Sequence, residues 1–365
     1  MRLADAEETI RACRFCFMCR YACPTFVATK RESVTPRGYG LLLTAIGGGK
    51  QAWTEDIARA FYQCTLCGLC RERCEYHWAE DDMVLAARGE AVCQGHVPEA
   101  VRVAAASLLD EKPWAGGAAL PRCGPHAEVL YLAGCQARER HPEIVEATAR
   151  ALSSLGVQWG VLAEEGCCGG GLYDLGFAAE AALQAQRLAS QISEVGPAAV
   201  VTGCPHCYRC LKELFPAWGV ALPPGIRVLH TAEFLGEMHA AGRLRLDGRE
   251  EEGCVGYHDP CMLGRKMGVY DAPRALIRAV TGSAPQELVH SGALAECCGA
   301  GAATFLVEPD VARRVAAVRL ERAREAGVTT LVTACQNCRA ALQEAAAGAL
   351  QVVDLAELVA RHCAR

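Results

Sequence analysis

Two cysteine runs with the same spacing constrain this chain more than any other feature. Both have the pattern C-x2-C-x2-C-x3-C; the members are Cys13, Cys16, Cys19 and Cys23, then Cys64, Cys67, Cys70 and Cys74. This spacing is typical of bacterial dicluster ferredoxins, in which three thiolates of a run bind one [4Fe–4S] cubane and the fourth binds the other cubane. The runs therefore predict two cubane clusters in the N-terminal part of the chain.

The same pattern predicts how the eight thiolates divide between the clusters. The first cluster is expected to take Cys13, Cys16, Cys19 and Cys74, and the second to take Cys64, Cys67, Cys70 and Cys23. Pro24 follows the first run as in ferredoxins, whereas Glu75 stands after the second run. Structural zinc is the alternative, but a tetrahedral zinc site gives no role to the third cysteine of each run.

Composition excludes several other classes of protein. The chain has 365 residues, 23 cysteines and a formal net charge of −5, so it has no broad basic field for nucleic acid. The charged N-terminus resembles no signal peptide, and no stretch is long and apolar enough to span a membrane. Clustered cysteines in such a chain favour metal ligation over disulfides. We expect a cytoplasmic protein, bound peripherally to the inner face of a membrane only through a partner.

A second cysteine pattern occurs twice in the rest of the chain. Each copy has a lone cysteine, a Cys-Cys-Gly motif and a C-x2-C pair; the members are Cys135, Cys167, Cys168, Cys204 and Cys207, then Cys261, Cys297, Cys298, Cys335 and Cys338. A repeat this long indicates a duplicated domain. Five thiolates exceed the requirement of one zinc ion or one cubane, and the neighbouring glycines allow close backbone approach to a cluster. Reduced structural thiols, or a redox-active C-x2-C pair, are the alternatives.

The secondary-structure pattern of the repeat predicts the fold. Short apolar runs at 129–133, 198–201, 255–258 and 329–333 end just before cysteines, and helical patterns cover 142–156 and 178–192. Alternating strands and helices indicate a mostly parallel sheet whose ligands lie beyond the carboxyl ends of the strands. The expected fold is an α-helical dicluster ferredoxin domain followed by two duplicated α/β Cys-Cys-Gly domains. The expected bounds are 1–92 for the ferredoxin domain, 93–126 for a linker, and 127–245 and 246–365 for the two copies.

These motifs together resemble a known family. The duplicated five-cysteine pattern is similar to the cysteine-rich domain in the B-type subunit of heterodisulfide reductase. Its fusion to a ferredoxin resembles the D-type subunit of heterodisulfide reductase and the iron–sulfur subunit of glycolate oxidase. The resemblance implies an oxidoreductase component with two cubane [4Fe–4S] clusters and up to two noncubane [4Fe–4S] clusters. All ten cysteines of the two five-cysteine sets are present for the latter.

Two functions follow from this resemblance. The first is an electron relay between a flavoprotein dehydrogenase and a quinone or membrane cytochrome partner. The dehydrogenase would act on a 2-hydroxy acid such as glycolate or lactate, or on glycerol 3-phosphate. No dinucleotide or Walker fingerprint is present, so the flavin is expected on the partner. The second is a heterodisulfide reductase-type catalytic subunit that reduces a disulfide at the noncubane clusters. In that case the two five-cysteine sites are expected to face one another across a cleft.

The remaining chemically active side chains have weaker signals. His206 and His258 lie beside the cysteine motifs and are candidates for proton delivery, although a hydrogen-bonded structural role is the simpler interpretation. Five cysteines fall outside every motif and are interpreted as small buried residues: Cys93, Cys123, Cys210, Cys254 and Cys363. Arg20, Arg71 and Arg73 lie within the ferredoxin runs. Positive charge near a cluster raises its reduction potential, and a solvated surface side chain is the simpler interpretation of each arginine.

Overall fold

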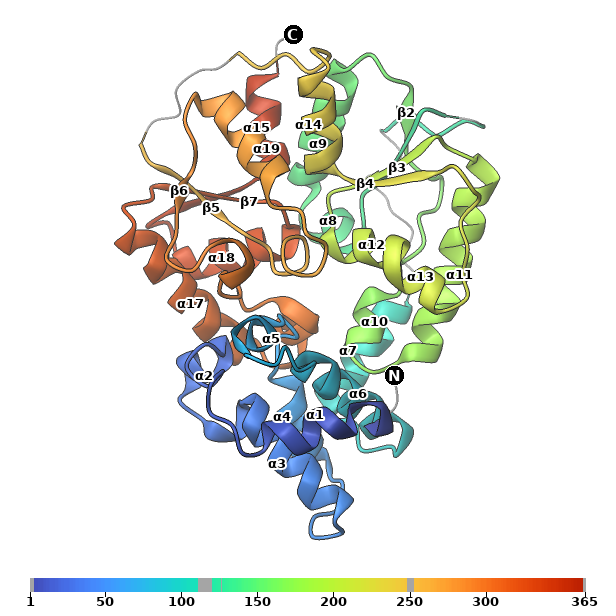
Figure 1. Cartoon of the computed structure of the whole chain (residues 1–365). Helices are drawn as coiled ribbons and strands as arrows, with labels where there is room; N and C mark the ends of the chain where they lie inside the picture. Colours follow the sequence, from blue (N-terminus) through green and yellow to red (C-terminus); the bar gives the residue numbers. More distant parts are fainter. Residues whose placement is uncertain (1–2, 111–119, 126, 248–252, 364–365) are drawn as a thin grey trace. The chain divides into compact units, whose positions relative to one another are not determined.

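The chain forms two compact units, each assembled from segments that are distant in the sequence. The computed structural model describes residues 3–110, 120–125, 127–247 and 253–363 (Figure 1). The first unit combines Met1–Asp110 with Gly171–Glu180 and His290–Arg322, and the remaining residues make up the second unit. The segment after each Cys-Cys-Gly motif therefore belongs to the unit that carries the two ferredoxin runs.

The N-terminal part of the first unit is helical, as predicted. Its helices are α1 (Glu7–Cys13), α2 (Pro24–Thr29), α3 (Pro36–Gly47), α4 (Glu55–Tyr62), α5 (Leu69–Arg73), α6 (Glu80–Cys93) and α7 (Glu99–Leu109). Proline is the first residue of α2 and α3, where its fixed φ suits a helix start. Thr54 caps the start of α4, because its side chain accepts a hydrogen bond from the Ile57 N–H.

Helix α7 falls inside the stretch expected as a linker. Its buried residues Val101, Ala104 and Ala105 give it an apolar face, and it packs against α16 (Thr304–Val307) of the same unit. The Pro- and Gly-rich residues 111–119 and residue 126 lie outside the described part of the chain.

The second unit contains two four-stranded parallel sheets. The first has the order β2-β1-β3-β4 and the second has the order β6-β5-β7-β8, so the two copies share one topology. The strands are β1 (Val129–Leu132), β2 (Trp159–Gly160), β3 (Ala199–Thr202) and β4 (Arg227–His230), then β5 (Val255–His258), β6 (Gln286–Glu287), β7 (Thr330–Thr333) and β8 (Gln351–Asp354). This topology confirms the predicted pair of duplicated α/β domains.

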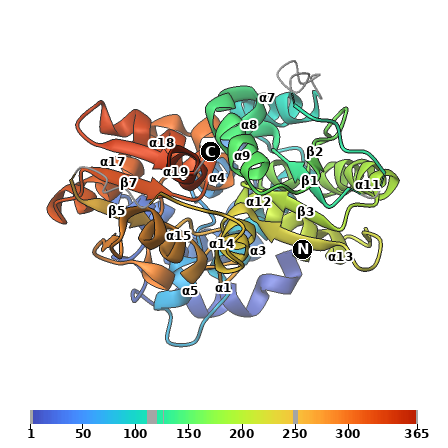
Figure 2. The same ribbon diagram turned by 90° about the horizontal axis from the view of Figure 1, so that it is seen from above.

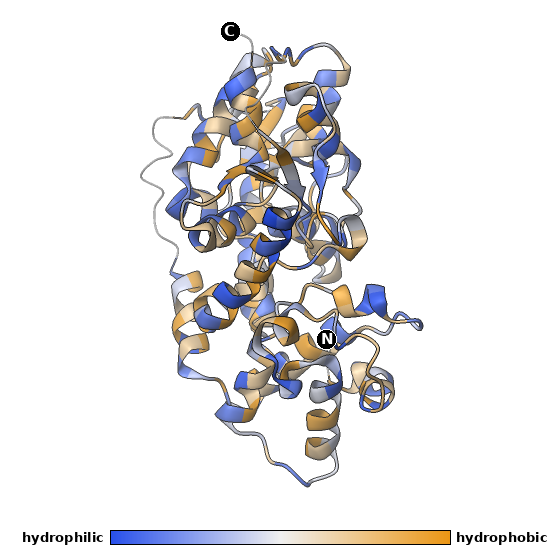
Figure 3. Cartoon of the chain, turned by 90° about the vertical axis from the view of Figure 1, so that its left-hand side faces the viewer, coloured by the Kyte–Doolittle hydropathy of each residue, from blue (hydrophilic) through white to orange (hydrophobic). Residues whose placement is uncertain are grey.

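Helices connect the strands of each sheet. In the first copy they are α8 (Cys135–Arg140), α9 (Pro142–Ser154), α10 (Gly170–Asp174), α11 (Ala178–Val195), α12 (Pro205–Arg209), α13 (Phe215–Ala217) and α14 (Thr231–Ala240). In the second copy they are α15 (Asp271–Thr281), α16, α17 (Pro309–Glu325), α18 (Gln336–Ala346) and α19 (Leu355–His362). Figure 3 shows that these helices carry both hydrophobic and hydrophilic residues, as expected for helices with one buried face.

The two copies share one hydrophobic core. Helices α9, α14, α15 and α19 lie between the two sheets and pack on one another (Figures 1 and 2). Val145 and Leu152 of the first copy join the same buried cluster as Leu276 and Leu358 of the second. The interface between the copies also contains an ion pair of 3.1 Å between Arg339 and Glu143. The duplicated domains are therefore packed as one body within the second unit.

Strands β4 and β8 are among the elements that the sequence did not predict. Each has only four residues, and each ends on the residue that caps the next helix. His230 accepts from the Ala232 N–H, and Asp354 accepts from the Ala356 N–H, both within capping boxes. No helix in the described residues is long and apolar enough to cross a membrane.

Gly169 is a sensitive position of the fold because its backbone has φ of +79° and a Cβ there would lie 2.4 Å from the Ala181 carbonyl oxygen. We predict that Gly169→Ala lowers the Tm of the anaerobically purified chain more than Gly156→Ala does. Gly156 has a similar φ of +65° but open space around it, so alanine there costs only the left-handed conformation, about 1–2 kcal/mol. Equal losses of Tm would show that the close approach at Gly169 is unimportant.

Candidate metal centres

Four cysteines from both ferredoxin runs line one cavity of the first unit. Cys13, Cys16, Cys19 and Cys74 surround a space of about 110 Å³, which is also bordered by Glu80 and Trp78. We call this group the first cluster site. It contains the four residues that the pattern assigns to the first cluster, including Cys74 from the other run. Their ligation of a cluster remains a prediction, and a cavity walled by four thiols fits the donor chemistry of a cubane.

The first cluster site concentrates acidic groups away from water. Burial raises the pKa of Cys13 to about 12, and the neighbouring Glu80 and Cys74 raise it further. Burial also raises the pKa of Glu80, to about 7, and its side chain is 2% exposed. Such a group of thiols ionises readily only when a cation joins it, because the thiolates otherwise repel one another. A bound iron cluster supplies that positive charge.

The other four ferredoxin cysteines form a second group, which we call the second cluster site. Burial raises the pKa of Cys23 to about 12, and the neighbouring Cys67 thiol also contributes to the rise. Burial raises the pKa of Cys64, Arg88 lowers it, and the nearby Cys23 and Cys67 raise it. Burial also raises the pKa of Cys70, followed by the carboxylates of Glu80 and Asp81 and then by Cys67 and Cys64. Cys23 thus lies with the three cysteines of the other run, which is the arrangement that the crossed pattern predicts.

One buried hydroxyl supports the presence of a bound group at the second cluster site. Tyr39 is 1% exposed, and its hydroxyl has no hydrogen-bond partner among the described residues. Burial raises the pKa of Tyr39 well above its usual range, and the nearby Cys64 and Cys23 also raise it. The hydroxyl therefore keeps its proton. A buried donor without an acceptor costs about 1–3 kcal/mol. Cluster sulfur atoms at this site would provide the acceptor.

The first five-cysteine set comes together at the carboxyl ends of β1 and β3. These strands are adjacent in parallel register, so the segments that follow them, with Cys135 and Cys204, leave the sheet side by side. Hydrogen bonds link Cys135 to Cys167, Cys167 to Cys168, and Cys168 to Cys207, the last at 3.4 Å between the sulfur atoms; Cys204 is linked to Cys207. We call this group the first Cys-Cys-Gly site.

Two glycines make room beside the sulfur atoms of this site. A Cβ at Gly134 would lie 3.3 Å from the Cys207 sulfur, and a Cβ at Gly170 would lie 2.8 Å from the Cys210 sulfur and 3.6 Å from the Cys168 sulfur. The absence of side chains at these positions leaves space where an inorganic cluster would approach the backbone. The arrangement therefore fits the group that the resemblance implies.

Polar residues hold the first Cys-Cys-Gly site in place. The buried Glu165 carboxylate accepts hydrogen bonds from the Ala133 N–H at 2.9 Å and the Gly134 N–H at 2.8 Å, and Arg138 lies 3.5 Å from it. Burial raises the pKa of Glu165, although Arg138 opposes that effect. These bonds connect the loop before Cys135 to the residues just before Cys167.

His206 lies directly at the thiols, as its sequence position suggested. Hydrogen bonds from Cys207 and then His206 lower the pKa of Cys204 well below its usual range. His230 has a structural role instead. It lies 3.1 Å from the Gly203 carbonyl and accepts from the Ala232 N–H, and burial lowers its pKa to about 4, so its ring is neutral. His206 is thus a group of this site that could carry a proton.

The second five-cysteine set is divided between the two units. Cys261, Cys335 and Cys338 belong to the second unit, where His258 has a ring nitrogen within 4.8 Å of the Cys338 sulfur. Cys297 and Cys298 belong to the first unit and are 1% and 2% exposed. The Gly299 N–H donates to the Cys297 sulfur at 3.3 Å, with Gly299 in the left-handed region at φ of +92°.

The Cys297–Cys298 segment packs on the second cluster site. A Cβ at Gly301 would lie 2.3 Å from the Thr65 carbonyl oxygen, so only glycine allows this approach. The Thr304 hydroxyl donates to the Cys64 carbonyl at 3.4 Å. Cys297 also lies within electrostatic range of Cys23. The first unit therefore contains three neighbouring thiol groups: the first cluster site, the second cluster site and the Cys297–Cys298 pair.

Cys210 is a site residue that sequence reasoning treated as ordinary core. It is buried at the start of the π-helical turn Cys210–Leu214, and its thiol is hydrogen-bonded to Cys168. The sequence feature that could have identified Cys210 as part of the site is its position three residues after Cys207, about one helical turn further on. The interpretation of the other cysteines outside the motifs as buried residues is wrong for Cys93, which is exposed; Cys123, Cys254 and Cys363 are half-buried.

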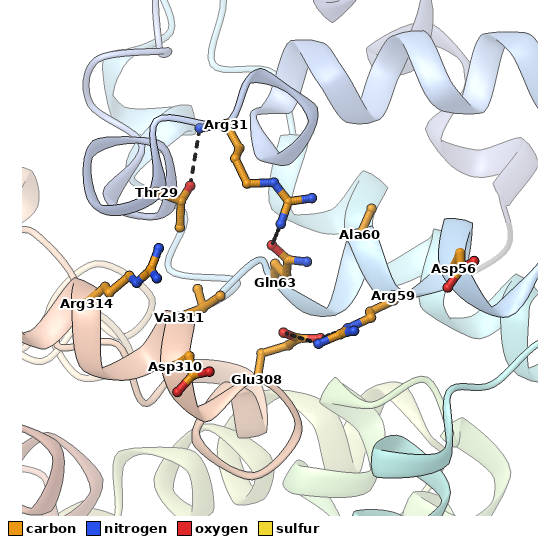
Figure 4. A pocket seen from close by; sticks show the side chains of 10 residues that line it. All are labelled: Thr29, Arg31, Asp56, Arg59, Ala60, Gln63, Glu308, Asp310, Val311 and Arg314. Carbon is orange, nitrogen blue, oxygen red and sulfur yellow. Dashed lines mark hydrogen bonds and ion pairs between the residues drawn. The ribbon is translucent and has the colours of Figure 1, made fainter.

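A polar pocket lies beside the second cluster site in the first unit (Figure 4). It has a volume of about 410 Å³ and is lined by Thr29, Arg31, Asp56, Arg59, Ala60, Gln63, Glu308, Asp310, Val311 and Arg314. Gln63, which precedes Cys64, accepts from Arg31 at 3.3 Å, and Arg59 pairs with Glu308. Three arginines and three carboxylates line the pocket, so their formal charges balance. The lining does not form a dedicated anion site.

Comparison with protein families agrees with the domain order. A model described as a 4Fe-4S dicluster domain matches residues 9–78, and one described as a cysteine-rich domain matches residues 129–212 and again 255–343. The chain belongs to the iron–sulfur oxidoreductase subunits that join a dicluster domain to two cysteine-rich domains. It is an iron–sulfur protein with an electron-transfer role.

Several members of this family match most of the chain. The D-type subunit of the dihydromethanophenazine:CoB–CoM heterodisulfide reductase of Methanosarcina acetivorans is 28% identical over 385 residues, covering 96% of this chain and 93% of that protein. The EtfAB:quinone oxidoreductase of Syntrophomonas wolfei is 27% identical, covering 90% of this chain and 48% of that protein. The B-type subunit of fumarate reductase (CoM/CoB) of Methanothermobacter marburgensis is 26% identical, covering 97% and 73%.

One solved structure shares the fold. A hypothetical protein from Helicobacter pylori superimposes with a TM-score of 0.59 at 11% identity, covering 90% of this chain and 68% of that one. At this identity the likeness concerns the fold alone.

The crossed ligation makes a prediction about paired variants. If Cys13 and Cys74 bind the same cluster, Cys13→Ala, Cys74→Ala and the double variant should all lose the same cubane EPR signal, with no further loss in the double variant. A double variant of Cys13 and Cys64 should lose both signals, because those residues lie in different sites. The exposed Cys93→Ala is the control and should lose neither. Loss of both signals in the Cys13 and Cys74 double variant would contradict the crossing.

Proposed function

We propose that this chain is the electron relay between a flavoprotein dehydrogenase and a quinone or membrane cytochrome. The observation that carries the proposal is the series of three thiol groups within the first unit, in which Cys23 lies within range of both Cys67 and Cys297. Iron–sulfur clusters supply one-electron exchange when bound. The chain itself contributes the spacing of the groups, their burial and their hydrogen bonds.

The electron balance of this function is simple. The dehydrogenase would oxidise a small substrate such as a 2-hydroxy acid and collect two electrons on its flavin. The relay would carry them one at a time, and a quinone would accept two electrons together with two protons. No proton needs to be moved by this chain in the relay, so His206 and His258 would serve only as hydrogen-bonding groups.

The surface around the first cluster site supports its role in exchange with a partner. Four large apolar side chains of this region are more than half exposed, and Met18 and Tyr76 also line the cluster cavity; the four are Phe15, Phe17, Met18 and Tyr76. The Arg14 guanidinium lies 4.6 Å from the centre of the Phe15 ring, and Arg37 lies 4.4 Å from that of Phe17. Aromatic residues and arginine are enriched where proteins dock. We place the contact with the flavoprotein here.

The proposed clusters are two cubanes, bound at the first and second cluster sites, and two noncubane clusters. The noncubane clusters would be bound by the first Cys-Cys-Gly site and by the second five-cysteine set. We predict about 16 iron atoms per anaerobically purified chain, four for each of these clusters. Iron near 8 atoms per chain with only cubane spectra would show that the Cys-Cys-Gly cysteines bind no cluster. Stoichiometric zinc in place of iron would contradict the relay.

Disulfide reduction is the second candidate function. Two observations favour it: the similarity to the D-type subunit of heterodisulfide reductase spans nearly both chains, and His206 lies at the thiols of the first Cys-Cys-Gly site. Cleavage of a disulfide to two thiols requires two electrons and two protons. His206 or His258 would deliver protons in that reaction.

An assay of the reduced chain distinguishes the two functions. For the relay, we predict rapid electron exchange with the flavoprotein that co-purifies under anaerobic conditions, and no turnover of glutathione disulfide or cystine. The matched variants Cys168→Ala and Cys298→Ala test whether any disulfide turnover depends on the Cys-Cys-Gly sites. Disulfide turnover by the wild type that is lost in both variants would contradict the relay and support the reductase.

A further inference from the structure

Arg88 is the most deeply buried cation of the N-terminal helices. It lies on α6, is 0% exposed and is surrounded by backbone carbonyl groups. Its guanidinium donates to Phe61 at 3.0 Å and also to Cys64, the first ligand of the second cluster site. It therefore holds the end of α4 and the start of the second ferredoxin run.

The same guanidinium reaches the segments that follow both Cys-Cys-Gly motifs. It donates to the Asp174 carbonyl at 2.7 Å and to the Ala302 carbonyl at 3.4 Å, and both residues belong to the first unit. Its face lies 4.9 Å from the centre of the Tyr62 ring, and the Tyr62 hydroxyl donates to the Leu175 carbonyl at 3.0 Å. One side chain thus joins three segments that are far apart in the sequence.

The charge of Arg88 has no carboxylate partner among the described residues, in contrast to other arginines near the clusters. Arg20 lies 2.9 Å from Glu32, and Arg71 lies 2.6 Å from Asp82. A buried cation surrounded only by neutral carbonyls is costly unless an anion lies close by. The guanidinium contacts the Cys64 carbonyl, and its charge lowers the pKa of the Cys64 thiol against the larger effect of burial, which raises that pKa. A negatively charged cluster bound at the second cluster site would therefore lie close to the charge of Arg88.

Tyr39 provides a second, independent contact with the same site. Its buried hydroxyl keeps its proton and has no acceptor in the described part of the chain, and it lies within electrostatic range of Cys64, Cys23 and Cys70. The ring is held by Phe61 at 5.5 Å between centres. The Tyr39 hydroxyl is therefore a buried donor near the second cluster site, in a ring that packs on Phe61.

We propose that Arg88 and Tyr39 are positioning residues that raise the reduction potential of the second cluster, Arg88 by its buried positive charge and Tyr39 by an O–H to sulfur hydrogen bond. Reduction adds a negative charge to a cluster, so a nearby cation and a hydrogen-bond donor both favour the reduced form. The inference rests on the proposed function and its crossed ligand assignment. The two side chains would make the second cluster, next to the Cys297–Cys298 pair, a better electron acceptor than it would be without them.

The test is an EPR-monitored redox titration of the full, anaerobically purified chain. The second cluster is identified as the signal that Cys64→Ala removes. Arg88→Met and Tyr39→Phe should each shift the midpoint potential of that signal to a lower value and leave the other cubane signal unchanged. Arg88→Lys keeps the charge and should give a smaller shift than Arg88→Met.

Two controls separate this role from a purely structural one. Arg319→Met removes another fully buried arginine, which lies 3.8 Å from Glu296, and Tyr62→Phe removes a buried hydroxyl that donates to a carbonyl. Both should lower Tm without shifting either potential. If Arg88→Met loses its iron, Tyr39→Phe, which deletes a single oxygen atom, still tests the proposal.

The outcomes separate this inference from the proposed function. Unchanged potentials in Arg88→Met and Tyr39→Phe, or the same shift in the two controls, would overturn the inference. A wild-type chain without two cubane signals would instead overturn the proposed function.

Discussion

The crowding of thiol groups in a buried unit is the constraint on which the rest of this structure depends. Eight ferredoxin cysteines and the Cys297–Cys298 pair share the first unit. Burial raises the pKa values of Cys13, Cys19 and Cys23, and neighbouring thiols also raise them. We therefore expect this unit to need the positive charge of its iron to reach its native packing. Its few buried cations are important because they balance the negative charge of the thiolates that the iron leaves over.

Parallel sheets solve the corresponding problem in the second unit. Each lone cysteine and each C-x2-C pair follows the carboxyl end of one of two adjacent strands, so the sheet itself brings them together. The Cys-Cys-Gly motif arrives on a separate loop, and Glu165 in the first copy shows how such a loop is fixed by hydrogen bonds from backbone N–H groups. Duplication gives the same placement of the lone cysteine and the C-x2-C pair in the second copy, whose Cys297 and Cys298 belong to the first unit. The two copies differ in detail, because Cys210 of the first copy has Ala341 as its counterpart in the second.

The cysteine spacing predicted much of this account from the sequence, because ligand spacing reflects local geometry. The alternation of short apolar runs with helical patterns predicted the duplicated parallel sheets and the strands before Cys135, Cys204, Cys261 and Cys335. Arg88 was not predictable in this way, since nothing in the local sequence of α6 shows that its side chain reaches carbonyls 27, 86 and 214 residues away. Instead, the sequence drew attention to Arg20 and Arg71, which the structure pairs with carboxylates. Long-range contacts of this kind depend on tertiary packing rather than on periodicity.

The central claim is that the two ferredoxin runs exchange their fourth ligands and so place the second cluster next to the Cys297–Cys298 pair. Anaerobic crystals measured at the iron absorption edge test it most directly. The account predicts one iron cluster bonded to Cys13, Cys16, Cys19 and Cys74, and another bonded to Cys23, Cys64, Cys67 and Cys70. An iron cluster bonded to Cys74 together with Cys64, Cys67 and Cys70, or anomalous signal from zinc at these sites, would contradict it.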